Sequence, residues 1–149
     1  METTLVLLKP DAIQRGLAGE IISRLEKTGM KITGMKLMQV SEELANQHYG
    51  EHVGKPFFDG LVSFITSGPI VAMALEGNGA VGIVRKTMGA TNPADSPPGT
   101  VRGDYGIDIG RNLVHGSDSV ESAKREVALF FEDAEMIDYS RSTDPWITE

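Results

Sequence analysis

The residue best placed for chemistry in this sequence is His115, which ends a short apolar segment just before a predicted helix. The free backbone N–H groups at the start of that helix would point toward anything bound beside the imidazole, and the helix dipole would favour a phosphate there. Glu126 lies on the flank of the apolar stripe of the same helix. Its carboxylate could fold back and hold one tautomer of the imidazole, which is how a histidine becomes a competent nucleophile or base. The alternative interpretation is a helix-capping histidine and a glutamate at the rim of a cleft.

Basic residues near the ends of apolar elements could supply a phosphate site around this histidine. Lys9 follows an apolar run, Arg85 lies in a predicted helix over 80–88, and Arg102 lies in a segment rich in Pro and Gly. Converging on the histidine, the three would form a clamp for phosphoryl transfer. Lone Lys and Arg residues are usually solvated surface charges, so the spacing alone leaves both interpretations open.

The segment 77–82, GNGAVG, follows a predicted strand and opens a helix, as the dinucleotide-binding pattern G-x-G-x-x-G does. A dinucleotide-binding unit also needs a second parallel strand with an acidic residue at its end. A Pro-rich segment follows here instead. We therefore interpret these glycines as a tight turn and a close approach of helix to strand.

The segment 48–52, HYGEH, matches the H-x-x-E-H signature of a zinc site. That signature needs a well-formed helix, whereas Gly50 interrupts the segment and Gly54 and Pro56 follow it. We interpret both histidines as residues of the surface or of a cleft rim, and we do not expect a zinc hydrolase.

Composition narrows the classes of function. The chain has 149 residues, no cysteine and a net charge of −7, which argues against broad binding to nucleic acid. It contains neither an apolar run of about 20 residues nor a basic, apolar signal segment at its start. We expect a protein of the cytoplasm with no membrane or nucleic-acid partner.

Strands and helices intermix along the chain, which predicts an α+β fold with helices packed on one small sheet. A long segment over 90–111 is rich in Pro and Gly, and such loops are usually functional or disordered. Asp118 and Glu121 predict a capping box at the start of the last helix. Strands are predicted over 3–8, 31–40 and 70–75; helices are predicted from Ala18 to Gly29, after Ser41, over 57–65, over 80–88 and after Asp118.

The segment 111–119, RNLVHGSDS, is the most specific motif of the chain. Five shorter segments accompany it: 9–11 (KPD), 48–49 (HY), 56–58 (PFF), 89–93 (GATNP) and 98–104 (PGTVRGD). In order and spacing, these six segments resemble the nucleoside diphosphate kinases, and the longest resembles the signature around the phosphorylated histidine of that family. The resemblance covers essentially the whole chain.

The resemblance implies a single domain over 1–149 with a ferredoxin-like α+β fold, in which helices pack on a four-stranded antiparallel sheet. It also implies transfer of the γ-phosphate of a nucleoside triphosphate, typically ATP, to a nucleoside diphosphate. The transfer would follow a ping-pong mechanism through a phosphohistidine at His115. Mg²⁺ would bridge the nucleotide phosphates, with no direct protein ligand and with Asp118 and Glu51 linked to it at most through water.

The resemblance also assigns roles to individual residues. His115 would attack the γ-phosphate, and Glu126 and Ser117 would orient its imidazole. Phosphates and sugar hydroxyls would be bound by Lys9, which also counts as catalytic, and by Tyr49, Arg85, Thr91, Arg102 and Asn112. Phe57 would stack on the base, with Leu61 and Ile109 completing a sandwich. A base held between apolar faces is recognised by its π-surface, so we expect weak discrimination between bases.

Two departures from the family pattern lie outside these roles. Phe130 stands where many members have Trp, and Thr148 interrupts the common ending Trp-Ile-Tyr-Glu. Because that ending helps the assembly of hexameric members and is largely retained, a homohexamer is favoured over a tetramer. The alternative function is a non-catalytic, nucleotide-binding regulatory module, which the presence of His115, Lys9 and Glu126 disfavours.

Overall fold

Four strands form one antiparallel sheet in the computed structural model, which describes residues 1–149. The strands are β1 (Glu2–Leu8), β2 (Lys31–Met38), β3 (Ile70–Gly77) and β4 (Val114–Gly116), in the order β2-β3-β1-β4. All three pairings are antiparallel. The predicted α+β fold with a ferredoxin-like, four-stranded antiparallel sheet is confirmed.

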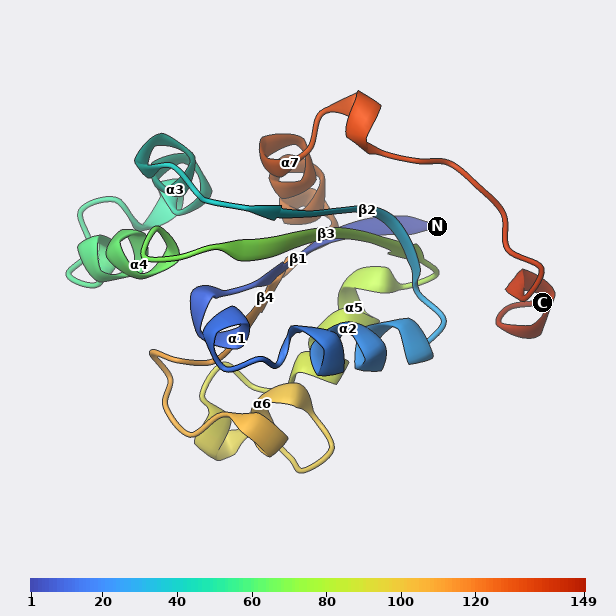
Figure 1. Cartoon of the computed structure of the whole chain (residues 1–149), viewed down its shortest axis with the longest axis horizontal. Helices are drawn as coiled ribbons and strands as arrows, with labels where there is room; N and C mark the ends of the chain where they lie inside the picture. Colours follow the sequence, from blue (N-terminus) through green and yellow to red (C-terminus); the bar gives the residue numbers. More distant parts are fainter.

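Helices cover both faces of this sheet (Figure 1). Because successive side chains of a strand point to opposite faces, β1 sends Leu5 and Leu7 into one core and Val6 and Leu8 into the other. Burial on both faces explains why β1 and β3 are continuous apolar runs. One core is closed by α3 (Glu42–His48), α4 (Phe58–Ile65) and α7 (Val120–Phe130), and the other by α1 (Pro10–Gln14), α2 (Ala18–Lys27), α5 (Ala80–Met88) and α6 (Val101–Tyr105).

Neither rejected motif forms the structure that its signature requires. The predicted tight turn is present at Gly79, which has a φ of 65°, but the predicted close approach of helix to strand is not found at Gly82, where an added Cβ would meet no atom within 4 Å. After α5 the chain forms no parallel neighbour for β3, whose partners β1 and β2 are both antiparallel. The H-x-x-E-H segment is not one helix, because α3 ends at His48 and a separate 3₁₀ turn, η1 (Gly50–His52), follows. None of the helices is long and apolar enough to span a membrane.

Three local predictions differ from the structure. The predicted capping box at Asp118 is wrong: Ser119, in extended backbone conformation, caps α7 by accepting the Ser122 N–H at 3.0 Å. β2 ends at Met38 rather than at residue 40, and its register shifts between Ile32 and Gly34, where a bulge accounts for the poor alternation. The long segment 90–111 is partly ordered into a 3₁₀ turn, η2 (Pro93–Asp95), and α6, because Asn92 and Thr100 cap these two turns.

The turn before α6 leaves no room for a side chain at Gly103. A Cβ atom there would lie 2.0 Å from the Pro97 carbonyl oxygen. The Thr100 hydroxyl ties the turn together, since it accepts the Gly103 N–H at 3.0 Å and donates to the Pro97 carbonyl at 2.6 Å. Gly103 is therefore needed to set the position of α6.

We predict that Gly103→Ala lowers the free energy of unfolding by about 1–3 kcal/mol, because the atom in the way belongs to the backbone and cannot rotate aside. Gly82→Ala is the matched control: it lies within α5, where an added Cβ would meet no atom within 4 Å. That variant should be neutral or more stable by about 0.5–1 kcal/mol. Urea denaturation at equal protein concentration compares the two, and an equal loss in both would contradict the close-packing argument.

Candidate active site

A cavity of about 240 Å³ opens beside β4, and most of the residues that line it are polar. Residues far apart in the sequence meet there, from the end of β1, the end of α3, α5, α6, β4 and α7. Of the predicted site residues, the cavity is lined by Lys9, Tyr49, Leu61, Arg85, Thr91, Arg102, Asn112, His115 and Glu126, together with Glu51 and Asp118. Ser117 is buried next to the cavity, and Phe57 and Ile109 lie outside its lining.

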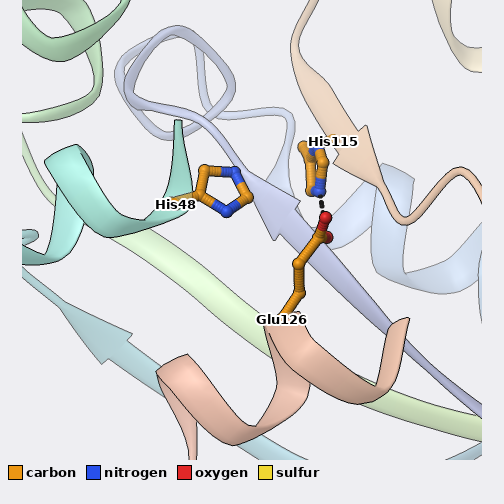
Figure 2. Close-up of side chains that lie close together, drawn as sticks. All are labelled: His48, His115 and Glu126. Carbon is orange, nitrogen blue, oxygen red and sulfur yellow. Dashed lines mark hydrogen bonds and ion pairs between the residues drawn. The ribbon is translucent and has the colours of Figure 1, made fainter. Parts of the chain in front are cut away.

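His115 and Glu126 form a close polar pair in the cavity. Nε2 of His115 lies 2.6 Å from Oε1 of Glu126, and the two side chains face each other (Figure 2). The Ser117 hydroxyl donates to the same carboxylate oxygen at 2.9 Å and accepts the Leu5 N–H at 3.3 Å. The carboxylate predicted to fold back onto the imidazole does so, and the serine fixes it from the other side.

The protonation of this pair follows from its surroundings. Burial alone would raise the pKa of Glu126, but the hydrogen bond and electrostatic attraction of His115, together with the hydrogen bond from the Ser117 hydroxyl, hold that pKa below its usual value. An ionised Glu126 accepts a proton from Nε2, so we assign the hydrogen of the neutral imidazole to Nε2. Nδ1 of His115 then carries the free lone pair.

The structure brings the three basic residues, predicted as a possible clamp, to this one cavity. Arg102 is buried and donates to the carbonyls of Asn112 at 3.1 Å and Val114 at 2.6 Å, while Arg85 donates to the carbonyl of Gly116 at 3.0 Å. The Lys9 ammonium donates to the Asn112 side-chain oxygen. The two arginines thus brace the backbone on either side of His115 as well as supplying charge.

None of these three cations forms an ion pair with a carboxylate. Burial, followed by the charge of Arg102, lowers the pKa of Lys9 to about 8. Burial and the charge of Arg85 lower the pKa of Arg102 to about 10. Positive charge is therefore concentrated by three cations that have no direct carboxylate partner, which favours the binding of an anion.

His48 is the functional candidate that the sequence interpretation missed. It was expected at the surface or a cleft rim, but its side chain is buried because α3 packs toward α7. Its ring stands edge-to-face against His115, with centroids 4.7 Å apart, and against Phe130 at 5.3 Å. Burial, with a smaller contribution from the charge of His115, lowers the pKa of His48 to about 3, so its ring is neutral. The fragment His48-Tyr49 of the family motif was the available signal.

Of the three residues predicted to hold a base, one lines the cavity and two are exposed. Leu61 lines it, whereas Phe57 and Ile109 are 50% and 59% exposed. The Phe57 ring lies 5.2 Å from the ring of His52, at the rim. An exposed aromatic ring beside the cavity is compatible with a stacked base, and the role of all three residues stays a prediction.

Comparisons with known proteins agree on one family. The family model described as nucleoside diphosphate kinase matches residues 2–136. The chain belongs to the nucleoside diphosphate kinase family. It is accordingly a phosphotransferase. A nucleoside diphosphate kinase of Carboxydothermus hydrogenoformans is 61% identical over 149 residues, 100% of both chains. One of Desulforamulus reducens is 58% identical over 149 residues, again 100% of both chains.

A solved structure of a nucleoside diphosphate kinase supports the same assignment. The structure of the halophilic kinase of Halobacterium salinarum in complex with CDP superposes with a TM-score of 0.97 at 55% identity, covering 99% of each chain. Identity at this level shows the shared family as well as the shared fold.

The carboxylates of the cavity do not form a shell for a hard cation. Glu51 and Asp118 are exposed, and Glu126 is held by His115 and Ser117. The one cluster of potential metal ligands is His48, His115 and Glu126, which offers two nitrogens and one oxygen. Mg²⁺ prefers oxygen ligands in octahedral geometry. The residues of this kinase therefore fit a Mg²⁺ ion that is held by nucleotide phosphates and waters.

We predict that Glu126→Gln slows phosphoryl transfer about 100-fold or more, because the amide can still accept the Nε2 proton but no longer carries the charge that stabilises a positive imidazole. Single-turnover transfer from a nucleoside triphosphate measures the effect. Glu121→Gln removes the same charge from an exposed position of α7 and is the matched control. Equal rates in the two variants would rule out an electrostatic role for Glu126.

We predict that affinity for a nucleoside triphosphate falls as the pH rises through about 8, because the free kinase loses the Lys9 proton in that range while the phosphates need the ammonium form. Bound phosphate stabilises that form, so proton uptake should accompany binding above this pH. Lys9→Arg keeps its charge and should flatten the dependence. Titration calorimetry on both sides of pH 8 makes the comparison, and the same decline in both proteins would assign it to another group.

Proposed function

We propose that this kinase transfers the γ-phosphate of a nucleoside triphosphate, typically ATP, to a nucleoside diphosphate through a phosphohistidine at His115. The observation that carries the proposal is the 2.6 Å contact between Nε2 of His115 and Glu126. This contact supports a proton on Nε2, which would leave Nδ1 as the nucleophilic nitrogen. Because one histidine serves donor and acceptor in turn, the kinetics should be ping-pong.

In the first half-reaction, Nδ1 of His115 attacks the γ-phosphorus. The bond from that phosphorus to the bridging β–γ oxygen breaks, and the nucleoside diphosphate leaves with the bond electrons. The phosphorylated ring keeps its Nε2 proton and carries positive charge, which the ionised Glu126 stabilises across the hydrogen bond. In the second half-reaction, a terminal phosphate oxygen of the acceptor attacks the phosphohistidine, and Nδ1 recovers its lone pair.

The cations of the cavity supply charge stabilisation during this transfer. Phosphoryl transfer needs positioning and electrostatic stabilisation more than covalent help from the protein. Lys9, Arg85 and Arg102 would neutralise the phosphate oxygens, and their convergence on the cavity of His115 supports this role. Tyr49, Thr91 and Asn112 would hold phosphates and sugar hydroxyls; burial and the charge of Glu126 raise the pKa of Tyr49 to about 12, so it remains a donor.

Base binding and the metal complete the proposed complex. Phe57 would stack on the base between Leu61 and Ile109, which gives weak selectivity among bases. Mg²⁺ held by the nucleotide would neutralise phosphate charge. Glu51 and Asp118 line the cavity and would contact the ion through water alone.

The proposal also covers the oligomeric state of the kinase and the compartment in which it acts. We propose that residues 1–149 form a single catalytic domain of the cytoplasm, acting on nucleoside di- and triphosphates as a homohexamer rather than a tetramer. Large apolar side chains exposed on β2 (Leu37), before β4 (Ile107) and in the tail (Trp146, 90% exposed) support self-association.

Incubation of the kinase with γ-labelled ATP tests the proposal. The protein should acquire an acid-labile, base-stable label that chases quantitatively onto an added nucleoside diphosphate. His115→Ala should still bind nucleotide but acquire no label. A regulatory module without turnover would bind nucleotide and stay unlabelled, and labelling of His115→Ala at the parent rate would refute the phosphohistidine.

A further inference from the structure

Three potential ligands for a transition metal surround the contact between His115 and Glu126. One nitrogen of His48, one of His115 and a carboxylate oxygen of Glu126 all lie within 4.8 Å of one another (Figure 2). The three side chains come from α3, β4 and α7, whose positions the packed cores fix. The H-x-x-E-H segment contributes only its first histidine to this group.

The His48 ring has an unused polar atom. Its Nδ1 has no hydrogen-bond partner, although the residue is only 5% exposed. Buried polar atoms are nearly always paired, because an unpaired one loses its hydration without replacement. The neighbouring rings of Phe130 and His115 stand edge-to-face to it and pack against it. A ligand at this point would satisfy the ring.

The ligand atoms of these three side chains favour Zn²⁺ over Mg²⁺. Two neutral imidazoles and one carboxylate form the His₂Glu set of catalytic zinc sites, with a fourth position left for water or a substrate oxygen. Mg²⁺ prefers all-oxygen shells, so the metal of the nucleotide would not compete here. The cavity lies beside the group and would offer the fourth position.

Small movements would complete the coordination. Zinc bonds of about 2.0–2.1 Å place tetrahedral ligand atoms roughly 3.3 Å apart. The 2.6 Å pair of His115 and Glu126 would open slightly, and His48 would move inward. His48 is the last residue of α3, where the helix gives way to η1, so its side chain can shift without disturbing a helix interior.

We propose that Zn²⁺ binds His48, His115 and Glu126 and reversibly inhibits the kinase. Coordination uses the lone pair of Nε2 of His115, so the single proton of the neutral ring must reside on Nδ1. A protonated Nδ1 has no lone pair with which to attack phosphorus. The ion therefore switches His115 to its non-nucleophilic tautomer, and the nucleotide need not be excluded. The binding of Zn²⁺ does not depend on the proposed function, whereas the inhibition of His115 phosphorylation rests on it.

Binding is tested first, on the full chain without nucleotide. Titration calorimetry with Zn²⁺ should show one site per chain that persists in excess Mg²⁺, and Co²⁺ as a probe should give the intense visible absorption of a four-coordinate site. His48→Phe keeps the ring packing against Phe130 but removes both nitrogens, and should weaken Zn²⁺ binding by about tenfold or more. His48→Asn provides the same test should the first variant fold poorly.

His52→Gln is the matched control, since it removes the second histidine of the H-x-x-E-H segment at the rim of the same cavity. It should bind Zn²⁺ as the parent does. Equal binding by the parent and both His48 variants, loss of binding in His52→Gln, or no binding by the parent would overturn the proposed site.

Inhibition is measured separately by labelling from γ-labelled ATP with and without Zn²⁺, each protein being compared with its own metal-free rate. Zn²⁺ should abolish labelling of the parent, a chelator should restore it, and the His48 variants should need about tenfold more Zn²⁺. Labelling of the parent that survives saturating Zn²⁺ would overturn the inhibition. A parent that is never labelled would refute the phosphohistidine instead, while calorimetry would still decide the metal site.

Discussion

The short contact between Nε2 of His115 and Glu126 involves a buried, negatively charged carboxylate. The neighbouring elements supply the hydrogen bonds that stabilise this charge. A buried carboxylate is tolerated only when its oxygens are hydrogen-bonded or paired. Here β1 supplies the framework: its Leu7 pairs with His115 in the sheet, and its Leu5 N–H holds the Ser117 hydroxyl that donates to Glu126. The sheet register and the packing of α7 on β1 therefore set the tautomer of the histidine.

A second constraint lies at Leu113, the residue just before β4, which has a φ of 74°. A buried leucine in the left-handed region is strained and persists only where its surroundings enforce it. The Asp11 carboxylate accepts the Leu113 N–H at 3.0 Å, and the Lys9 N–H donates to the Leu113 carbonyl at 2.9 Å. The segment Lys9-Pro10-Asp11 thus clamps the backbone that carries Asn112 and His115, a role for Asp11 that the sequence comparison left unassigned.

The spacing of apolar residues, together with helix caps and Gly or Pro residues, predicted most of the strands and helices. These signals are local in the sequence, as in β1, β3 and the amphipathic helices. The cap of α7 was misplaced by one residue because Asp118 and Ser119 are both good capping types, and only the backbone decides between them. Contacts between residues far apart in the sequence could not be predicted from such local patterns. The burial of His48 depends on how α3 meets α7, and the meeting of Lys9, Arg85 and Arg102 depends on the sheet order; the family resemblance, rather than spacing, indicated that these cations act together.

The distribution of charge explains how a chain with a net negative charge can bind an anionic substrate. The net charge is −7, yet the cavity holds three cations without carboxylate partners. Burial, and then their mutual repulsion, lower the pKa values of Lys9 and Arg102, so holding these positive charges close together is electrostatically unfavourable. A polyphosphate relieves that repulsion as it binds, so part of its affinity comes from strain already present in the folded protein. Because the net charge of the chain is negative, attraction for a polyphosphate depends on this local concentration of cations beside His115.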